Sequence, residues 1–509
     1  MTAALYDVVV PTVGRASLAE LVAALAAGRG PAPGALVVVD DRPCVRLGRE
    51  LPAFAWPGVP VRVIPTGGRG PAAARNAGAL YTSAPWIAFL DDDVLPDPGW
   101  KEDLARDLAE LPPGVAASLG AVGVPPPSGR RPTDQERSVL RLASAAWISA
   151  DVAIRRSAFE ALGGFDERFP RAYREDTDLQ LRLAAARYRT ARGARRSTHL
   201  LRSGSSWASL AAQRGNADDV LLAALHGRDW RARTGEAPSL LPRHVASVAA
   251  AAAALLAAAV GAAALALAAL AAWAALTAAF FWRRVARGTR TAREIAAMAG
   301  TSVAIPFAAA AWHLRGRIRV ARLRRAGPLG WIPPSRRPLR AALFDRDGTL
   351  IEDVPGNKDC ARVRPCPGAR RALHRLRLAG VRIAVVTNQA GVAEGAFDAG
   401  DVERVNRRVQ ALLGPIEGFF VCPHGRTDGC GCRKPEPGLV REALAKLDVD
   451  PAECVLVGDT GADVDAARAA GVRAILVPNR VTRMEEVHAA PEVARDVDAA
   501  ALRALGVDA

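Results

Sequence analysis

The sequence predicts two Rossmann-like α/β domains joined by an alanine-rich, membrane-associated helical segment. Near both ends of the chain, short apolar runs typical of buried strands alternate with stretches of helical periodicity, and several runs end in acidic side chains. A long uncharged segment lies between them. A length of 509 residues accommodates two catalytic domains and such a segment. We therefore place the domains at residues 1–230 and 336–509, with residues 231–335 as the connecting segment and basic linker.

Acidic and polar side chains follow three strand-like runs of the N-terminal domain. The runs, each with the side chains after it, are residues 7–10 before Thr12, residues 36–39 before Asp40, and residues 86–90 before Asp91, Asp92 and Asp93. Ligands of open α/β sheets bind outside the carboxyl ends of the strands, so these side chains are candidate ligands of one site. A carboxylate triplet there can hold a divalent cation that bridges a nucleotide diphosphate.

Two further segments of this domain fit a diphosphate site. Residues 67–78 supply flexible glycine backbone and a cation, Arg75, near the expected position of the diphosphate. Glu175 and Asp176 precede an expected helix over residues 179–186. Acidic side chains also stabilise the first turn of a helix through its dipole, so a purely structural role for this pair is the alternative.

In order and spacing, these segments resemble the family 2 glycosyltransferases of GT-A fold over roughly residues 5–205. The resemblance implies a nucleotide-sugar donor held by Thr12, Asp40, Arg75 and Asp91, with Asp40 at the base or ribose. It also implies that Asp91 and Asp93 form a metal-binding Asp-x-Asp, with Asp93 on Mg²⁺ or Mn²⁺. Asp176 would deprotonate the acceptor hydroxyl for an inverting displacement.

Two positions qualify this resemblance. His199 falls where some members of the family contact the diphosphate or the metal, although a lone histidine is more often structural. Arg42 and Pro43 stand where many relatives have glycine or serine. This departure leaves the identity of the sugar donor open, and the acceptor is equally open between a glycan and a lipid-linked molecule.

The connecting segment is uncharged from residue 245 to residue 282 and consists mostly of alanine. One membrane span needs about twenty apolar residues, so the segment is long for one helix and adequate for two, with Gly261 at a turn. The arginines that flank it on both sides are Arg231, Arg233, Arg243, Arg283, Arg284, Arg287 and Arg290. Basic flanks at both ends predict a hairpin with both catalytic domains at the cytoplasmic face of the cell membrane. The alternative is a soluble linker in a cytoplasmic protein.

A second apolar stretch, residues 295–314, contains Pro306 and His313 and runs into six arginines. We interpret it as an interfacial helix followed by a basic tether for the membrane surface. Much of the net charge of +16 lies in such segments. The arginines border apolar stretches and do not alternate with aromatic residues, so we do not expect nucleic-acid binding.

The C-terminal domain carries the segment Asp345-Arg346-Asp347-Gly348-Thr349 directly after the apolar residues 341–344. A strand that ends in two carboxylates one residue apart, followed by a turn on glycine, holds both acids at the same edge of the sheet. This arrangement suits nucleophilic phosphoryl transfer, in which Asp345 attacks phosphorus and Asp347 shuttles the proton.

Three later segments supply the remaining chemistry of a phosphate site. They are Thr387 with Asn388 after the strand-like residues 381–386, Lys434 after Arg433, and Asp459 after the apolar residues 455–457. A hydroxyl and an ammonium suit the phosphate oxygens. Asp459 and Asp345 suit a divalent metal that offsets the repulsion between carboxylate and phosphate.

A cluster of cysteine and histidine within eleven residues forms a second candidate metal site: Cys422, His424, Cys430 and Cys432. Three thiolates and one imidazole are the composition of a closed structural zinc site. The alternative is a group of free or disulfide-bonded cysteines. No paired spacing is found among the other four cysteines, which are Cys44, Cys360, Cys366 and Cys454. A reducing compartment is therefore favoured.

Over roughly residues 340–480, the four phosphate-site motifs resemble the haloacid dehalogenase phosphatase superfamily. The short distance between Thr387 and Lys434, the zinc loop and the Cys-Arg-Lys-Pro segment resemble its capless subgroup, which contains D-glycero-D-manno-heptose 1,7-bisphosphate phosphatase and histidinol-phosphate phosphatase. The resemblance implies these roles: Asp345 as nucleophile, Asp347 as general acid/base, Thr387, Asn388 and Lys434 on the phosphate, Arg433 on the substrate, and Asp345, Asp347 and Asp459 on Mg²⁺.

Together these features predict a bifunctional, membrane-associated enzyme of cell-surface glycan synthesis. One domain would transfer a sugar from a nucleotide-sugar donor. The other would hydrolyse a sugar phosphate, most simply D-glycero-D-manno-heptose 1,7-bisphosphate to the 1-phosphate, through an aspartyl-phosphate intermediate. The alternatives are histidinol phosphate or another small phosphomonoester as the substrate, or a scaffold in which one domain only binds its ligands.

Overall fold

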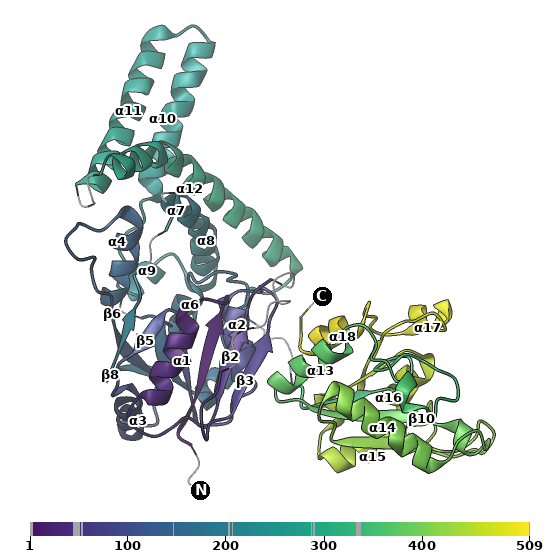
Figure 1. Cartoon of the computed structure of the whole chain (residues 1–509). Helices are drawn as coiled ribbons and strands as arrows, with labels where there is room; N and C mark the ends of the chain where they lie inside the picture. Colours follow the sequence, from purple (N-terminus) through teal and green to yellow (C-terminus); the bar gives the residue numbers. More distant parts are fainter. Residues whose placement is uncertain are drawn as a thin grey trace.

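The computed structural model describes residues 4–43, 51, 54–145, 147–201, 204–205, 207–286, 288, 291–331 and 337–507. Cys44, Arg287 and Arg290, which enter the sequence predictions, lie outside these described residues. Two α/β domains occupy the ends of the chain, and a helical segment projects from the first of them (Figure 1). The predicted fold class is therefore confirmed.

Within the described residues, the N-terminal domain is built on a mixed eight-stranded sheet of order β3-β2-β1-β4-β7-β6-β8-β5. The strands are β1 (Tyr6–Thr12), β2 (Leu36–Asp40), β3 (Val61–Pro65), β4 (Trp86–Leu90), β5 (Val94–Pro96), β6 (Val115–Gly123), β7 (Asp151–Arg155) and β8 (Arg189–His199). The first four run parallel to their neighbours in β3-β2-β1-β4, whereas β7 is antiparallel to β4 and β6. Strands β1, β2 and β4 are buried along their whole length, as near-continuous apolar runs predict for parallel strands covered on both faces.

Helices cover this sheet and lead into the connecting segment. They are α1 (Ser17–Ala27), α2 (Pro71–Ala79), α3 (Trp100–Glu110), α4 (Asp134–Leu140), α5 (Arg156–Ala161), α6 (Glu175–Ala185), α7 (Ala208–Ala211), α8 (Gly215–His226) and α9 (Trp230–Arg233). Helix α6 begins four residues before the predicted start at residue 179, so Glu175 and Asp176 lie within its first turn. Arg174, just before this helix, has a φ of 80°.

The uncharged segment forms an antiparallel helical hairpin. Helices α10 (Leu241–Ala259) and α11 (Ala263–Val285) are joined by a turn at Gly261, as predicted, and they project from the domain (Figure 1). The leucines of the hairpin face outward, and Leu255 is 74% exposed. Among the described helices, three are long and apolar enough to cross a membrane: α10, α11 and α12 (Ala292–Ala326).

Helix α12 differs from the hairpin because one face of it packs against the N-terminal domain. The second apolar stretch and the arginines after it form this single helix of 35 residues, which crosses the base of the hairpin and continues beside α8 (Figure 1). A Cβ atom added to Gly316 would lie 2.8 Å from the backbone of Ala217 on α8, so the two helices are in close contact. The predicted interfacial helix and basic tether are thus one continuous helix in contact with the N-terminal domain.

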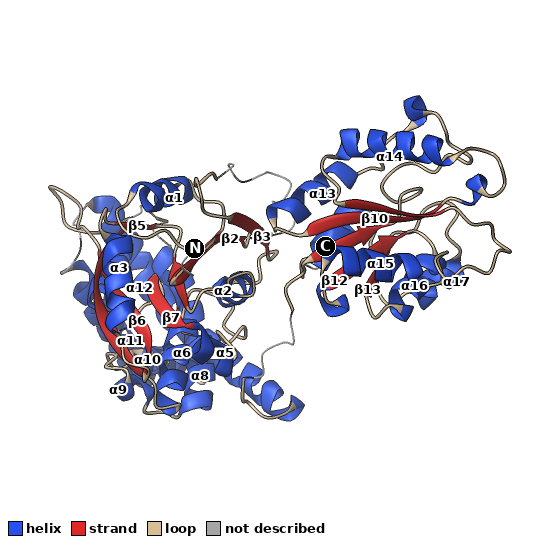
Figure 2. Ribbon diagram, turned by 90° about the horizontal axis from the view of Figure 1, so that it is seen from below, coloured by secondary structure: helices blue, strands red, loops and turns tan. Residues whose placement is uncertain are grey.

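The described residues of the C-terminal domain contain a parallel five-stranded sheet of order β11-β10-β9-β12-β13. Its strands are β9 (Ala341–Phe344), β10 (Arg382–Asn388), β11 (Gly418–Cys422), β12 (Cys454–Gly458) and β13 (Arg473–Leu476). Its helices are α13 (Ala369–Leu378), α14 (Ala399–Leu413), α15 (Gly438–Leu447), α16 (Gly461–Ala469), α17 (Met484–Ala489) and α18 (Val497–Ala504). Helices α13 and α14 cover one face of the sheet, and α15 and α16 cover the other (Figure 2).

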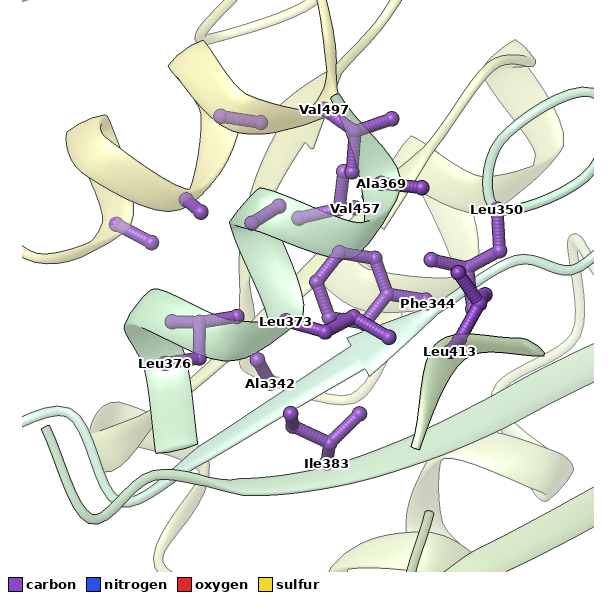
Figure 3. Packing of buried hydrophobic residues seen from close by; sticks show 14 of the residues in the cluster. Ala342, Phe344, Leu350, Ala369, Leu373, Leu376, Ile383, Leu413, Val457 and Val497 are labelled. Carbon is purple, nitrogen blue, oxygen red and sulfur yellow. The ribbon is translucent and has the colours of Figure 1, made fainter. Parts of the chain in front are cut away.

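The alternation of β9 explains how this short strand holds the centre of the domain. Ala342 and Phe344 point to the face covered by α13, where Phe344 packs near Leu373 and Val457 (Figure 3). Ala341 and Leu343 belong to the core on the opposite face. Because both faces are buried, the register of β9 is fixed, and with it the position of the acids that follow.

Candidate active sites

The carboxyl ends of β9, β10 and β12 meet at one pocket in the C-terminal domain. Phe344 pairs with Val385 on one side and with Val457 on the other, so Asp345, Thr387 and Asp459 emerge at the same edge of the sheet. The pocket has a volume of about 510 Å³. Its walls include Asp345, Asp347, Thr387, Asn388, Arg433, Lys434 and Asp459, all of which the sequence predicts as site residues.

Lys434 is buried among acids at the floor of this pocket. Its Nζ donates to Asp345, to Asp463 Oδ1 at 2.6 Å and to the carbonyl oxygen of Val386 at 2.9 Å. Burial lowers the pKa of the ammonium, but the attraction of Asp345 and Asp463 outweighs it and raises the pKa above its ordinary value. Lys434 is therefore a fixed positive charge beside Asp345.

Asp345 and Asp459 form a carboxylate cluster that suits a hard cation. Burial raises the pKa of Asp345, against the opposing effect of Lys434, and burial together with Asp463 raises the pKa of Asp459 to about 6. Converging acids of this kind are destabilised until a cation lies between them, and carboxylate oxygens are the ligands that Mg²⁺ prefers. The carboxylates of Asp345 and Asp459 thus fit the predicted magnesium, whereas the carboxylate of Asp347, the third predicted ligand, accepts from Arg346 and Gln389.

Neighbouring side chains hold Asp459 in place. Thr349 Oγ1 donates to Asp459 Oδ1 at 3.1 Å, and Asn479 Nδ2 donates to Asp459 Oδ2 at 2.6 Å. Gly348 has a φ of 84°, and a Cβ atom there would lie 2.5 Å from Asp459 Oδ2. Only glycine therefore permits the turn after the two acids to pass so close to the third.

The remaining predicted residues lie at the rim of the pocket. Asn388 contacts the backbone of Lys434 in both directions: its Nδ2 donates to the Lys434 carbonyl at 3.0 Å, and its Oδ1 accepts from the Lys434 N–H at 3.1 Å. In this structure Asn388 thus orients the segment that carries the lysine. Arg433 Nη1 donates to the carbonyl oxygen of His424 at 3.2 Å and so joins the pocket to the cysteine loop.

The four predicted zinc ligands converge. Their ligand atoms all lie within 4.8 Å of one another, and the closest pair is His424 Nδ1 and Cys432 Sγ at 3.2 Å. The Sγ atom of Cys422 lies 3.7 Å from that of Cys430 and 3.4 Å from that of Cys432. Burial, together with the neighbouring thiols of Cys422 and Cys430, raises the pKa of Cys432 to about 12. The site fits tetrahedral Zn²⁺.

We expect one zinc ion per chain and its loss on substitution of a ligand. Cys430→Ser should reduce bound zinc to less than about a tenth of one equivalent and should lower the stability of the C-terminal domain, since structural zinc contributes folding energy. Elemental analysis of protein purified without chelator measures the metal. Cys360→Ser, which changes a cysteine outside the cluster, is the matched control and should keep the full equivalent. A wild-type chain without zinc would contradict the assignment.

The acids of the N-terminal site are joined by a buried arginine. Arg75, on α2, is only 1% exposed; its Nη2 donates to Asp91 Oδ1 at 2.6 Å and its Nη1 to Glu175 Oε1 at 3.0 Å. The sequence predicts Arg75 as a ligand of the diphosphate, whereas the structure places it beneath the site as a link between the Asp-x-Asp segment and α6. Burial, helped by Asp176, raises the pKa of Glu175 to about 8, and burial raises the pKa of Asp176.

Within the acid triplet, the middle residue has a different role from its neighbours. Asp92 is 1% exposed and accepts from Thr12 Oγ1 at 2.6 Å and from Arg15. Thr12, predicted to bind the donor, is thus engaged in supporting the triplet. Asp93 Oδ1 lies 3.6 Å from His199 Nε2, because β5 and β8 pair Val94 with His199. The structure therefore brings the histidine beside the predicted metal ligand.

The two acids at the end of β2, Asp40 and Asp41, make different contacts. Arg42 binds Asp40 with two side-chain contacts, Nε to Oδ1 at 2.8 Å and Nη2 to Oδ2 at 2.6 Å. Asp41 accepts from the N–H of Arg69 at 2.8 Å and from that of Gly70 at 2.9 Å, so it fixes the glycine-rich segment. A Cβ atom on Gly70, where φ is 96°, would lie 2.4 Å from the carbonyl oxygen of Pro170.

The sequence analysis assigns no role to several residues that shape the two sites. They are Arg15 and Asp41 in the first domain and Gln389, Asp463 and Asn479 in the second. Asp463 could have been predicted as a site residue, because it lies in the same motif as Asp459. Asn479 lies in the loop after β13, and no local pattern marks it.

Comparisons with known proteins place a different family at each end of the chain. The model for glycosyl transferase family 2 matches residues 7–162, and the HAD-hydrolase-like model matches residues 431–501. A D-glycero-alpha-D-manno-heptose-1,7-bisphosphate 7-phosphatase of Mycobacterium tuberculosis is 42% identical over 131 residues, which cover 24% of this chain and 69% of the relative. A D-glycero-beta-D-manno-heptose-1,7-bisphosphate 7-phosphatase of Bordetella bronchiseptica is 35% identical over 144 residues, which cover 27% of this chain and 80% of the relative.

Among solved structures, a D,D-heptose 1,7-bisphosphate phosphatase of B. bronchiseptica, complexed with magnesium and phosphate, is 32% identical to this chain. The alignment covers 33% of this chain and 98% of that protein, with a TM-score of 0.30. Each of these alignments covers no more than about a third of this chain. The family 2 match begins and ends within the first α/β domain.

Proposed function

Because the chain belongs to the HAD-like hydrolases through its C-terminal domain and carries a family 2 glycosyltransferase domain at its N-terminus, we propose that it hydrolyses a heptose 1,7-bisphosphate at C7. The chain is a phosphatase fused to a glycosyltransferase. The observation that carries the substrate proposal is the pocket in which Asp345, Lys434 and Asp459 converge, in a domain similar to heptose 1,7-bisphosphate 7-phosphatases.

The phosphatase reaction uses two acids that differ in role. A carboxylate oxygen of Asp345 attacks the C7 phosphorus, and the bond from phosphorus to the sugar oxygen breaks while Asp347 donates a proton to that oxygen. Asp347 then takes a proton from water, which attacks the aspartyl phosphate and releases inorganic phosphate. Lys434 and Thr387 hold the phosphate oxygens. Asp345 and Asp459 would hold Mg²⁺, which would supply positive charge that offsets the repulsion between carboxylate and phosphate.

The second candidate substrate is histidinol phosphate, because a phosphatase of that compound has the same predicted set of motifs. Fusion to a glycosyltransferase favours the sugar phosphate. A phosphate-release panel of both heptose 1,7-bisphosphate anomers, histidinol phosphate and simple sugar phosphates separates the candidates. We expect the highest kcat/KM for one of the heptose bisphosphates, and a clear preference for histidinol phosphate would replace the proposal.

In the glycosyltransferase domain, the acids divide between donor and acceptor. We assign Asp91 and Asp93 to a divalent cation, Mg²⁺ or Mn²⁺, that holds the diphosphate of the nucleotide sugar, with His199 beside Asp93 as a further donor. Asp176 is the base that takes the proton of the acceptor hydroxyl. Arg75 keeps these two groups in register, because it binds Asp91 and the neighbour of Asp176 at once.

The hairpin of α10 and α11 is the proposed membrane anchor. Its leucines face outward along both helices, and a row of outward leucines on an unsupported hairpin is costly in water. Both helices are long enough to insert. Both ends of the hairpin then lie on the cytoplasmic side, where nucleotide sugars and sugar phosphates reach the two sites. The alternative interpretation of the same segment is a soluble linker.

This topology predicts that tags on both termini are protected from external protease in intact spheroplasts. The tags should be cleaved only after the membrane is broken, because an even number of spans leaves both domains inside. A periplasmic marker protein that is digested in the same sample shows that the protease is active. Digestion of one tag in intact spheroplasts would contradict the hairpin, and a fully soluble chain without detergent would establish the linker.

A further inference from the structure

We propose that Arg346 is a positioning residue for the general acid Asp347 and that Asn406 anchors it. The inference rests on the proposed phosphatase mechanism and adds two residues to it. Arg346 stands between the two catalytic aspartates in the sequence, in the turn that follows β9. Its side chain binds one of them, Asp347.

The guanidinium of Arg346 contacts two side chains, Asp347 and Asn406. Its Nη2 donates to Asp347 Oδ2 at 2.8 Å, and its Nη1 donates to Asn406 Oδ1 at 2.8 Å. Arg346 is 2% exposed and Asn406, on α14, is 7% exposed. A buried arginine is costly unless it is paired and fully hydrogen-bonded, so the position of its charge is set by these partners.

A second donor reaches the same carboxylate oxygen. Gln389 Nε2 donates to Asp347 Oδ2 at 2.8 Å and to Thr387 Oγ1 at 3.0 Å. Asp347 is thus held from the α14 side by Arg346 and from the phosphate side by Gln389. Its side chain keeps 27% exposure to the pocket, where the leaving oxygen would lie. Fixing a general acid in this way matters because a displacement of about 1 Å can cost about a hundredfold in rate.

The leaving group distinguishes this role from a general effect on stability. The alkoxide of a sugar must be protonated as the bond from phosphorus to oxygen breaks, whereas p-nitrophenolate leaves without a proton. Loss of Arg346 leaves the nucleophile Asp345 and its partner Lys434 in place. Formation of the phosphoenzyme should therefore slow much more for sugar phosphates than for p-nitrophenyl phosphate.

The test compares kcat/KM of the full-length chain, in detergent and Mg²⁺, on heptose 1,7-bisphosphate and on p-nitrophenyl phosphate. Arg346→Gln should lose at least about tenfold more activity on the sugar phosphate than on the aryl phosphate, within the range that general acid catalysis contributes. Arg346→Lys should show an intermediate selectivity, because one ammonium cannot reach both partners. Asn406→Ala should also lose more activity on the sugar phosphate than on the aryl phosphate, and its loss should be smaller than that of Arg346→Gln.

The matched control is Asn479→Ala, which removes an amide from a different carboxylate, Asp459. Its losses should be equal on both substrates and should shrink as Mg²⁺ is raised. Equal losses on both substrates for Arg346→Gln, or no loss, would overturn the inference.

A wild-type chain that hydrolyses p-nitrophenyl phosphate but not the heptose bisphosphate would refute only the proposed substrate. The same comparison of variants would then use the alkyl phosphate that the wild-type chain hydrolyses best. A wild-type chain that hydrolyses neither would refute the proposed function and the inference with it.

Discussion

Replacement of Asp345 by asparagine is expected to abolish phosphate release while the C-terminal domain keeps its fold and its zinc. An amide cannot attack phosphorus as a carboxylate does, and it is a poorer ligand for magnesium. Loss of a covalent nucleophile costs several orders of magnitude in kcat, about a thousandfold or more. The fold should survive because Lys434 retains Asp463 and the Val386 carbonyl as partners.

Phosphate release, zinc content and thermal unfolding of the purified Asp345→Asn chain measure this outcome together. Asp465→Asn makes the same chemical change at an exposed acid of α16 and should leave turnover unchanged. If the Asp345→Asn chain kept more than about a tenth of wild-type turnover, Asp345 would not be the nucleophile.

The second large effect concerns the glycosyltransferase domain, where two substitutions should separate binding from transfer. Asp93→Ala should weaken nucleotide-diphosphate binding at least about tenfold, because the diphosphate loses a ligand of its cation. Asp176→Asn should leave donor binding nearly unchanged and reduce transfer by about a hundredfold or more, since proton abstraction is needed only in the transition state. Calorimetry with a panel of nucleotide diphosphates and Mn²⁺ or Mg²⁺ measures the first effect before an acceptor is known.

Asp103→Ala, on the surface of α3, is the control for these calorimetric measurements and should bind as the wild type does. Absence of metal-dependent binding to any nucleotide diphosphate by the wild-type chain would favour the scaffold hypothesis for this domain. Equal losses of donor binding in the Asp93 and Asp176 variants would show that the two acids do not divide as we propose.

Residues at the ends of buried strands were predictable from the sequence. Asp345, Thr387 and Asp459 each follow a short apolar run, and parallel strands bring such positions together whatever the intervening chain does. The zinc set was predictable for a different reason, because all four ligands lie within one short loop. The uncharged hairpin needed only the absence of charge over a long stretch and a glycine near its middle.

Contacts made between distant elements were not predictable in the same way. Asn406 reaches Arg346 only because α14 packs over β9 and β10, and its own sequence context is that of an ordinary amphipathic helix. Arg75 stands in a glycine-rich segment that suggests a diphosphate ligand, yet the inner face of α2 buries it against Asp91 and Glu175. The sequence shows that a cation such as Arg75 is present. Only the packing of the folded chain decides whether that cation binds a ligand or a neighbouring acid.

The most direct test of the central claim is phosphorus NMR of heptose 1,7-bisphosphate incubated with the full-length chain and Mg²⁺. The account predicts that the C7 phosphate signal is replaced by that of inorganic phosphate, that the C1 phosphate remains, and that Asp345→Asn shows neither change. Retention of both phosphates by a folded, zinc-loaded wild-type chain, or loss of the C1 phosphate first, would contradict it.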